Sequence, residues 1–512
     1  MFHIIFMPPD TNSRGLLRVA EERIDRDWNT YTKLAEIGCV RNPVEDYIVV
    51  TYPPRTTVDD LSQEERMVYS DQIMDGLRGA DEDVRVSGYV HFPFCSRRCT
   101  FCHYLSDGGK SGDQIESYLR VLSREISTLG SRLSTKKKLR SLFIGGGSPS
   151  IMTPEDLYVL LEQMRQCFDI PTGTEVTLEL HPEAVRRNPE MYLDGIKQAG
   201  INRVNVGLQS ADQRILDASN RGHTVEEAVR LHEMCKELGL TTNIDLIWGG
   251  LFGDNSRSFL ESLELAFSQD PDTVTTYHMW LRQGTPEFQR YTERPYMYPN
   301  WLETLRERIL ANLVAEKYGY TQEYIDWYRR STSGKSYQQQ RDKWGTDKTI
   351  LLPFGSGVYG WNFISSDRNF MYWHPFNTQE YQRLVMSSQL PIDRCIVLDN
   401  NETARRHIIF RLKSGGIAKD DFGRLLENAP GIRLDIENKM AKLIDLGLIE
   451  EHENTYRLTD VGSWIGDEVA STFTSEDVLR RMKSRGSNQE EKKYEWYVDP
   501  KMVRRMKNLV GD

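Results

Sequence analysis

The chain has 512 residues, of which 39% are apolar, so it is long enough to form two or three domains around a large core. Its formal net charge of −10 and pI near 5.7 argue against a general nucleic-acid or membrane-surface binder, because such proteins usually carry a basic excess. The seven cysteines are odd in number, and three fall within eight residues, which favours a reducing compartment and one ligand cluster over a disulfide framework. We therefore expect a cytoplasmic protein without a membrane or nucleic-acid partner.

The first 85 residues are polar and irregular, and we interpret them as an N-terminal extension. The apolar run at residues 1–7 is too short to span a membrane and predicts a strand. Residues 50–62 predict an extended arm, and residues 63–77 predict a helix.

Between residues 86 and 325, short β-rich segments alternate with longer helical patterns. The predicted strands occupy residues 86–92, 140–147, 175–180, 203–209, 241–249 and 273–281. The helical patterns between them occupy residues 115–129, 153–167, 189–199, 225–238 and 256–267. This alternation predicts an α/β fold with a parallel sheet curled into a full or partial βα barrel. The reactive groups of such a barrel gather at the C-terminal ends of its strands.

The rest of the chain divides into three predicted parts. Residues 326–399 are rich in aromatic residues and glycine, and we expect them to complete the barrel or to form a lid. Residues 400–475 predict helices followed by two short strands around a turn, which is typical of a winged-helix-like domain. Its candidate recognition segment, residues 435–446, carries three acidic residues and two lysines, a poor surface for phosphate. Residues 476–512 form a charged tail.

A cysteine motif directly follows the first predicted strand. Cys95, Cys99 and Cys102 are spaced by four and three residues, so one loop can ligate three irons of a [4Fe–4S] cubane. The fourth iron then stays open to an amino-carboxylate ligand. The alternatives are free cysteines, or a zinc site completed by His103 or a distant residue, although zinc sites generally pair CxxC units. We therefore expect the three cysteines to bind a [4Fe–4S] cluster.

Two further motifs are candidates for ligand binding. Gly145, Gly146 and Gly147 end a predicted strand before Ser148, and glycine lets the backbone approach a ligand closely. A run of glycines alone more often marks a turn. This run follows the strand next to the one that leads to the cysteine loop, and this position favours ligand binding. Glu179 lies on an otherwise apolar strand, where an inward carboxylate is costly unless it is paired. It either binds a ligand or points outward to a helix lysine.

The first strand carries two polar aromatic residues. Tyr89 and His91 alternate with Val90 and Phe92, so both should face one side of the sheet. That side is normally apolar in a parallel sheet. The pair therefore indicates either a pocket or satisfied core packing.

The segment YVHFPFCSRRCTFC, residues 89–102, resembles the signature of the radical S-adenosylmethionine (SAM) superfamily. From about residue 89 to 458 the chain is similar to the oxygen-independent coproporphyrinogen III dehydrogenase branch, which includes haem-chaperone-like proteins and class C methylases and cyclopropanases. The resemblance implies a [4Fe–4S] cluster, two molecules of SAM, an electron donor of the reductase or flavodoxin type, and a C-terminal domain that covers the site. It implies first-SAM contacts at the GGG-Ser segment, Glu179, Gln209, Arg221 and Asp245, and second-SAM contacts at Gly355, Gly357 and Trp361.

One departure from the branch bears on the reaction. The dehydrogenase carries a further cysteine two residues after the third ligand, where this chain has Tyr104. We therefore expect a class C enzyme that transfers a methyl or methylene group to an sp² carbon of a small conjugated or aromatic substrate. Tyr89, His91 and His103 are candidate bases for the proton that is lost. A tetrapyrrole-processing enzyme or a haem chaperone is the alternative, and the oligomeric state is not indicated.

Aromatic residues near the predicted barrel mouth could stack on a flat substrate, and we expect up to half of them to do so. They are Tyr277, His278, Trp280, Trp344, Tyr359 and Trp361.

Overall fold

The computed structural model describes residues 13–31, 51–108, 112–186, 188–282, 284–332, 335–344, 348–364 and 369–485. The predicted strand at residues 1–7 and the tail beyond residue 485 lie outside these ranges. Within the described ranges, no helix combines the length and the apolar character needed to span a membrane.

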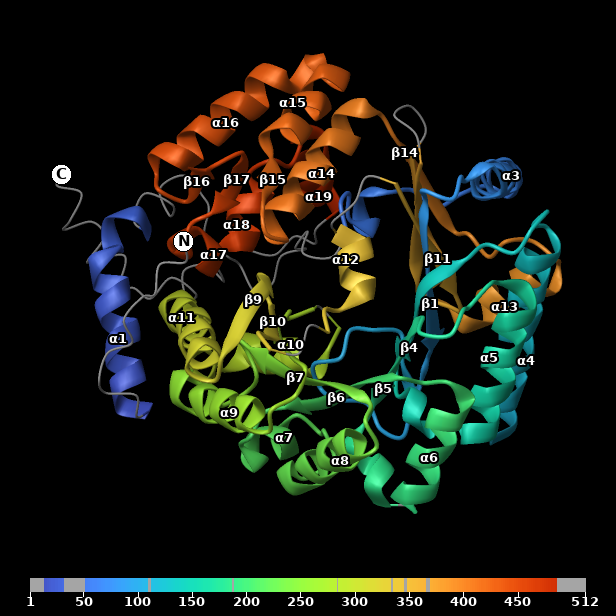
Figure 1. Cartoon of the computed structure of the whole chain (residues 1–512), viewed down its shortest axis with the longest axis horizontal. Helices are drawn as coiled ribbons and strands as arrows, with labels where there is room; N and C mark the ends of the chain where they lie inside the picture. Colours follow the sequence, from blue (N-terminus) through green and yellow to red (C-terminus); the bar gives the residue numbers. More distant parts are fainter. Residues whose placement is uncertain are drawn as a thin grey trace.

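A single 12-stranded sheet organises the chain (Figure 1). In spatial order its strands are β14 (Arg394–Leu398), β13 (Asn369–Trp373), β12 (Tyr359–Phe363), β11 (Thr349–Phe354), β1 (Arg85–Phe92), β4 (Leu139–Gly146), β5 (Glu175–Leu180), β6 (Arg203–Gln209), β7 (Thr241–Trp248), β8 (Thr273–His278), β10 (Trp327–Arg330) and β9 (Tyr320–Tyr324). The strands from β11 to β8 are parallel, and the outer ones are antiparallel. The predicted α/β fold with a parallel sheet is thus confirmed. In the described part of the chain the two ends of the sheet are not paired, as in a partial barrel.

Helices follow the outer face of the parallel strands (Figure 1). They are α4 (Gly112–Ser131), α5 (Pro154–Cys167), α6 (Pro189–Ala199), α8 (Val225–Glu237) and α9 (Ser256–Ser268). Capping boxes at Thr153 and Thr224 begin α5 and α8, where side chains satisfy backbone N–H groups that have no partner within the helix. The helices bury aliphatic residues against alternate strand positions such as Val90, Leu142 and Leu178.

The other face of the sheet is more polar, and the strand register shows why. Residues paired across parallel strands point to the same side, and Tyr89 pairs with Phe143, which in turn pairs with Thr177. Glu179 lies two residues beyond Thr177 and pairs with Asn205. Tyr89 and Glu179 therefore share this inner face. Sequence periodicity could predict a shared face only for residues of the same strand.

The region predicted to complete the barrel or cover it contributes strands on both sides of the parallel core. β10 extends the sheet beyond β8, with β9 from the preceding region outside it, while β11 to β14 extend the sheet beyond β1. The remaining elements up to residue 386 are α1 (Ser13–Arg26), η1 (Arg55–Thr57), α3 (Gln63–Gly79), β2 (Phe94–Cys95), β3 (Asp107–Gly108), η2 (Pro149–Ile151), η3 (Pro182–Arg186), α7 (Gln213–Ala218), α10 (Pro286–Glu293), η4 (Pro295–Met297), α11 (Trp301–Lys317), α12 (Gln338–Trp344) and α13 (Thr378–Met386).

The C-terminal elements, orange to red in Figure 1, gather on one side of the molecule. They are α14 (Asn400–Lys413), β15 (Ile417–Ala418), α15 (Lys419–Asn428), η5 (Pro430–Ile432), α16 (Arg433–Asp445), β16 (Ile449–His452), β17 (Thr455–Leu458), α17 (Asp460–Trp464), α18 (Gly466–Ser471) and α19 (Glu476–Arg485). A small sheet of order β15-β17-β16 follows the helices, with the strand–turn–strand unit that the sequence predicts.

Candidate functional site

The loop that carries the cysteine motif is fastened at several points. Its start, β2, pairs with β3 at its end. The side-chain amide of Asn220 donates to the carbonyl oxygen of Arg98 over 2.8 Å, and the Ser96 hydroxyl donates to Glu183 over 2.7 Å. The loop is therefore held in place by its own β2–β3 pairing and by contacts from two distant segments.

The three cysteine thiols lie close enough to one another to affect the pKa of Cys95. Burial, followed by the nearby Cys102 and Cys99, raises the pKa of the Cys95 thiol to about 12. Among the described residues, no three His, Cys, Asp or Glu side chains converge closely enough to hold one metal ion. Thiolates that each ligate a different corner of a cubane stand further apart than the ligands of a single zinc. Three thiols on one loop that interact electrostatically are a donor set that suits three irons of a cubane.

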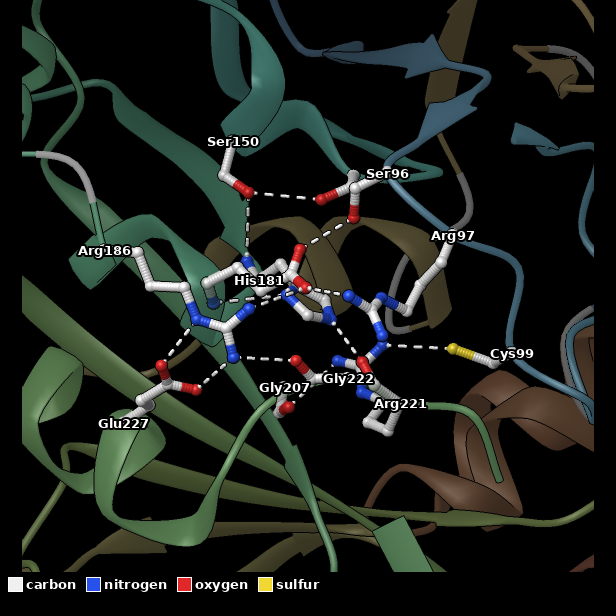
Figure 2. Close-up of polar contacts among 12 residues, drawn as sticks. Ser96, Arg97, Cys99, Ser150, His181, Arg186, Gly207, Arg221, Gly222 and Glu227 are labelled. Atoms are coloured by element: carbon white, nitrogen blue, oxygen red, sulfur yellow. Dashed lines mark hydrogen bonds and ion pairs between the residues drawn. The ribbon is translucent and has the colours of Figure 1, made fainter. Parts of the chain in front are cut away.

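Arg221 connects the cysteine loop to the sheet (Figure 2). Its Nη1 donates to the Sγ of Cys99 over 3.6 Å, and its Nη2 donates to the carbonyl oxygen of Gly207 over 2.9 Å. His181 fixes the Arg221 backbone, because its Nε2 donates to the Arg221 carbonyl oxygen over 3.1 Å. The Nε of Arg221 is buried and has no hydrogen-bond partner.

Two carboxyl groups lie on the inner face beside this arginine. Burial and then the neighbouring Asp245 carboxylate raise the pKa of Glu179 to about 8, against the lowering effects of the Gly146 N–H and the charge of Arg221. The N–H of Gly146 donates to Glu179 over 3.0 Å, which shows that Glu179 points inward and not to a helix lysine. Burial also raises the pKa of Asp245 to about 7. Such a pair suits a cationic ligand, which would restore the ordinary acidity of both groups.

Gln209 sits at an irregular point of the sheet. Its φ of +71° lies in the left-handed region that L-residues seldom adopt, and the pairing of β6 with β7 shifts register there. Its Oε1 atom is buried without a hydrogen-bond partner. Backbone strain together with an unsatisfied polar atom is typical of a ligand-binding position.

The predicted glycine segment packs closely against β1 and β2. A Cβ atom on Gly147 would lie 2.6 Å from the carbonyl oxygen of Phe94, and one on Gly146, whose φ is +115°, would lie 2.7 Å from His91 Nδ1. A Cβ on Gly145 would lie 2.8 Å from the Cδ of Glu179. Ser148 is buried and donates its N–H to the Phe94 carbonyl over 2.8 Å. Glycine is needed here for packing as well as for any ligand.

His91 holds the cysteine loop. Its Nε2 lies 3.0 Å from the carbonyl oxygen of Leu105, so Nε2 carries the hydrogen and donates it. Burial lowers the pKa of His91 to about 4. This contact gives the imidazole a positioning task that the sequence did not indicate.

The other two candidate bases lie in aromatic surroundings. Tyr89 stacks on Phe143 with ring centroids 5.5 Å apart, and burial raises the pKa of its phenol well above the usual range. His103 stacks on Tyr104 at 4.5 Å, and burial lowers its pKa to about 4. A neutral His103 can accept a proton, whereas Tyr89 holds its own proton strongly.

The second glycine loop is tied to β1 by a buried network. Gly355 donates its N–H to Glu125 over 2.8 Å, and a Cβ on it would lie 2.6 Å from the carbonyl oxygen of His91. Tyr118 donates its hydroxyl to that His91 carbonyl over 2.9 Å. A Cβ on Gly357 would meet the side chain of Leu105 at 3.0 Å, so the loop also touches the cysteine loop. The sequence did not predict roles for Tyr118 and Glu125, because no sequence signal distinguishes them from other residues of an amphipathic helix.

The predicted aromatic residues divide into two groups. Tyr277, Trp280 and Tyr359 retain accessible surface near the site. Trp361 is 2% exposed, and its indole N–H donates to the Thr349 hydroxyl over 3.0 Å, so this group is already satisfied. Trp344 is buried against Phe410 of α14. His278 packs edge-on against Trp248, whose register places it on the outer face.

Comparisons with known proteins agree with this geometry. Residues 89–266 match the radical SAM superfamily. The chain is 28% identical over 267 residues to the oxygen-independent coproporphyrinogen III oxidase of Paracoccus denitrificans, covering 50% of this chain and 56% of that protein. It is 24% identical over 400 residues to the heme chaperone HemW of Bacillus subtilis, covering 76% of this chain and 99% of HemW.

The coproporphyrinogen III oxidase HemN of Escherichia coli, a solved structure, superimposes with a TM-score of 0.67 at 20% identity, covering 79% of this chain and 93% of HemN. This likeness concerns the fold. The chain spans less than two thirds of the length of the Paracoccus oxidase. Residues 89–266 therefore match the radical SAM superfamily, and the chain is similar to proteins of the coproporphyrinogen III oxidase-like branch, a similarity that implies a [4Fe–4S] cluster and SAM as cofactors.

Proposed function

We propose that the protein is a radical SAM enzyme that acts on a tetrapyrrole or a similarly flat, conjugated small molecule. One observation carries the proposal: Tyr104 and Tyr277 are 56% and 40% exposed, yet burial raises the pKa of both phenols. Both rings are therefore open to a small molecule, and we call the region that they border the substrate space. Both phenols also interact electrostatically with Glu179 and Asp245, so this space adjoins the candidate SAM residues.

The residues of this chain would bind the cofactors, orient the substrate and exclude water from it. When bound, the cluster supplies the electron and SAM supplies the hydrogen-abstracting 5′-deoxyadenosyl group. Glu179 and Asp245 would hold the positively charged part of SAM, and Arg221 would fix its position next to Cys99. Tyr104 and Tyr277 offer ring faces for stacking on a planar substrate and exclude water from it.

The comparisons favour a tetrapyrrole over the class C methyl transfer expected from the sequence. The relatives reported above are named for coproporphyrinogen III oxidation or as heme chaperones. Methyl transfer stays a second candidate for one reason. Tyr104 occupies the position where the dehydrogenase carries a further cysteine, and it stacks on His103, a neutral group that could take up the proton lost after methyl transfer.

Anaerobic turnover separates these activities. Reconstituted protein is incubated with SAM, dithionite and coproporphyrinogen III, and the nucleoside products are quantified. Formation of 5′-deoxyadenosine with consumption of the porphyrinogen, but without S-adenosylhomocysteine, is the expected result. Formation of both nucleosides would support methyl transfer instead. Tight haem binding without turnover of SAM would contradict an enzymatic role, and the variant with Cys95, Cys99 and Cys102 all replaced by alanine is the blank.

A further inference from the structure

Arg406 on α14 is a buried cation at the edge of the inner face. It is 3% exposed, and its guanidinium carbon lies 5.1 Å, 4.1 Å and 4.9 Å from the ring centroids of Trp361, Phe363 and Phe410. Cation–π contacts of this kind offset only part of the cost of removing a cation from water.

No anion balances this guanidinium among the residues that the structure describes. Its Nε is buried without a hydrogen-bond partner, and no ion pair or hydrogen bond to Arg406 is formed within those ranges. Burial accordingly lowers the pKa of Arg406 to about 9. The adjacent Arg405, in contrast, has partners: it donates to Asp435 over 2.9 Å and to the Phe473 carbonyl over 3.0 Å.

Arg406 also lies close to the proposed substrate space. Trp361 pairs with Leu351, which is two residues from Pro353, the partner of Tyr89 in β1, so Trp361 and Tyr89 share the inner face. Tyr359 interacts electrostatically with Arg406 and with both Tyr89 and Tyr104. Tyr359 therefore lies within electrostatic range of both the unpaired guanidinium and Tyr104, which follows the cysteine motif.

We propose that Arg406 anchors a carboxylate group of a small molecule bound on the inner face of the sheet. A planar guanidinium matches a carboxylate in two parallel hydrogen bonds, and the incoming anion would supply the missing counter-charge. The inference rests on the proposed function for the identity of that molecule, a conjugated substrate with carboxylate side chains. A second SAM, which also carries a carboxylate, is the other source of the same chemistry.

The test compares Arg406→Met with Arg405→Met in the full-length, reconstituted protein. Without ligand, Arg406→Met should melt at or above the wild-type temperature, because it removes an unpaired buried cation. Arg405→Met should melt lower, because it removes the hydrogen bonds to Asp435 and to the buried Phe473 carbonyl. Affinities are then measured for coproporphyrin III and its neutral tetramethyl ester, and for SAM with its stoichiometry. Benzoate and the uncharged benzamide are compared by thermal shift.

Each outcome has a defined meaning. We expect the wild-type protein to prefer the coproporphyrin acid, and Arg406→Met to bind it about tenfold more weakly or worse, without change for the ester. Loss of one of two bound SAM molecules in Arg406→Met would assign the anchor to SAM instead. Protection by benzoate but not benzamide, lost in Arg406→Met, would sustain the inference even if coproporphyrin failed to bind and the proposed function fell. The inference is overturned if acids and neutral analogues behave alike in the wild-type protein, or if Arg406→Met melts as low as Arg405→Met.

Discussion

The guanidinium of Arg221 joins the Sγ of Cys99, at 3.6 Å, to the carbonyl oxygen of Gly207, at 2.9 Å. A single side chain thus links a predicted cluster ligand to the strand that leads to Gln209. Hydrogen bonds to a cluster sulfur withdraw electron density from it and raise the reduction potential. Arg221 can therefore influence the cluster and a bound SAM together.

Replacing Arg221 with lysine keeps the charge but removes the two-pronged donor. We expect SAM affinity to fall about tenfold or more and the cluster potential to become more negative. Equilibrium dialysis and a redox titration followed by electron paramagnetic resonance measure the two effects. Arg214→Lys, at a side chain that is 91% exposed, is the matched control. If Arg221→Lys kept the wild-type SAM affinity and cluster potential, the contact between Arg221 and Cys99 would contribute to neither.

Glu179 predicts a pH dependence of SAM binding. Its pKa of about 8 means that it is mostly protonated at pH 7, whereas the ionised form attracts a cationic ligand. SAM affinity should therefore rise, by about tenfold, as pH increases from 7 to 9. Glu179→Gln should bind SAM weakly at both pH values, and the exposed Glu155→Gln should follow the wild-type curve. A flat wild-type profile would refute the assignment.

The sequence predicted correctly the elements whose bounds depend on residues nearby in the chain. β5 and β6 begin and end at the predicted residues, because short β-rich runs bounded by turn and loop residues are a local signal. The inward direction of Glu179 was left open, since periodicity gives a face but does not say which face is inside. Only the contact with Gly146, on the neighbouring strand β4, decides it.

Long-range contacts explain what the sequence could not reveal. Trp361 was expected to touch a cofactor, and the sequence could not show that it lies on β12 beside β11 and packs against Arg406 of α14. Arg405 and Arg406 are indistinguishable in a helical pattern, and only the positions of Asp435 and Trp361 separate a paired cation from an unpaired one.

Gln209 predicts a trade-off between stability and binding. Glycine adopts φ of +71° without strain, so Gln209→Gly should leave the free energy of unfolding unchanged or raise it by about 1 kcal/mol. SAM affinity should fall, because the side-chain oxygen is lost. Asn188→Gly, at a φ of +41°, should show the same stability effect with normal SAM binding. Denaturant melts and SAM titrations of both variants are the measurements, and equal SAM affinity in the two would contradict a binding role for Gln209.

Glu125 predicts a loss of stability as pH rises toward 8. Burial raises its pKa from 4.5 to about 8, so stability falls between these pH values, where only the unfolded state has lost the proton, and levels off above 8. The melting temperature of the wild-type protein should therefore drop more between pH 6 and 9 than that of Glu125→Gln. The glutamine keeps an acceptor for Gly355 and Tyr381. Glu116→Gln, exposed on the same helix, should match the wild-type protein; parallel curves for all three would exclude Glu125 as the source.

The cysteine motif gives the most direct prediction. Alanine at Cys95, Cys99 or Cys102 removes one of three thiolates that must close around the cubane together, so bound iron should fall from about four atoms per chain toward zero. Cys167→Ala, which changes a half-buried thiol on α5, should keep its iron. Metal analysis and the visible absorbance of anaerobically purified protein provide the readout. Zinc in place of iron, or iron retained when all three cysteines are replaced, would rule out the cluster and the radical chemistry built on it.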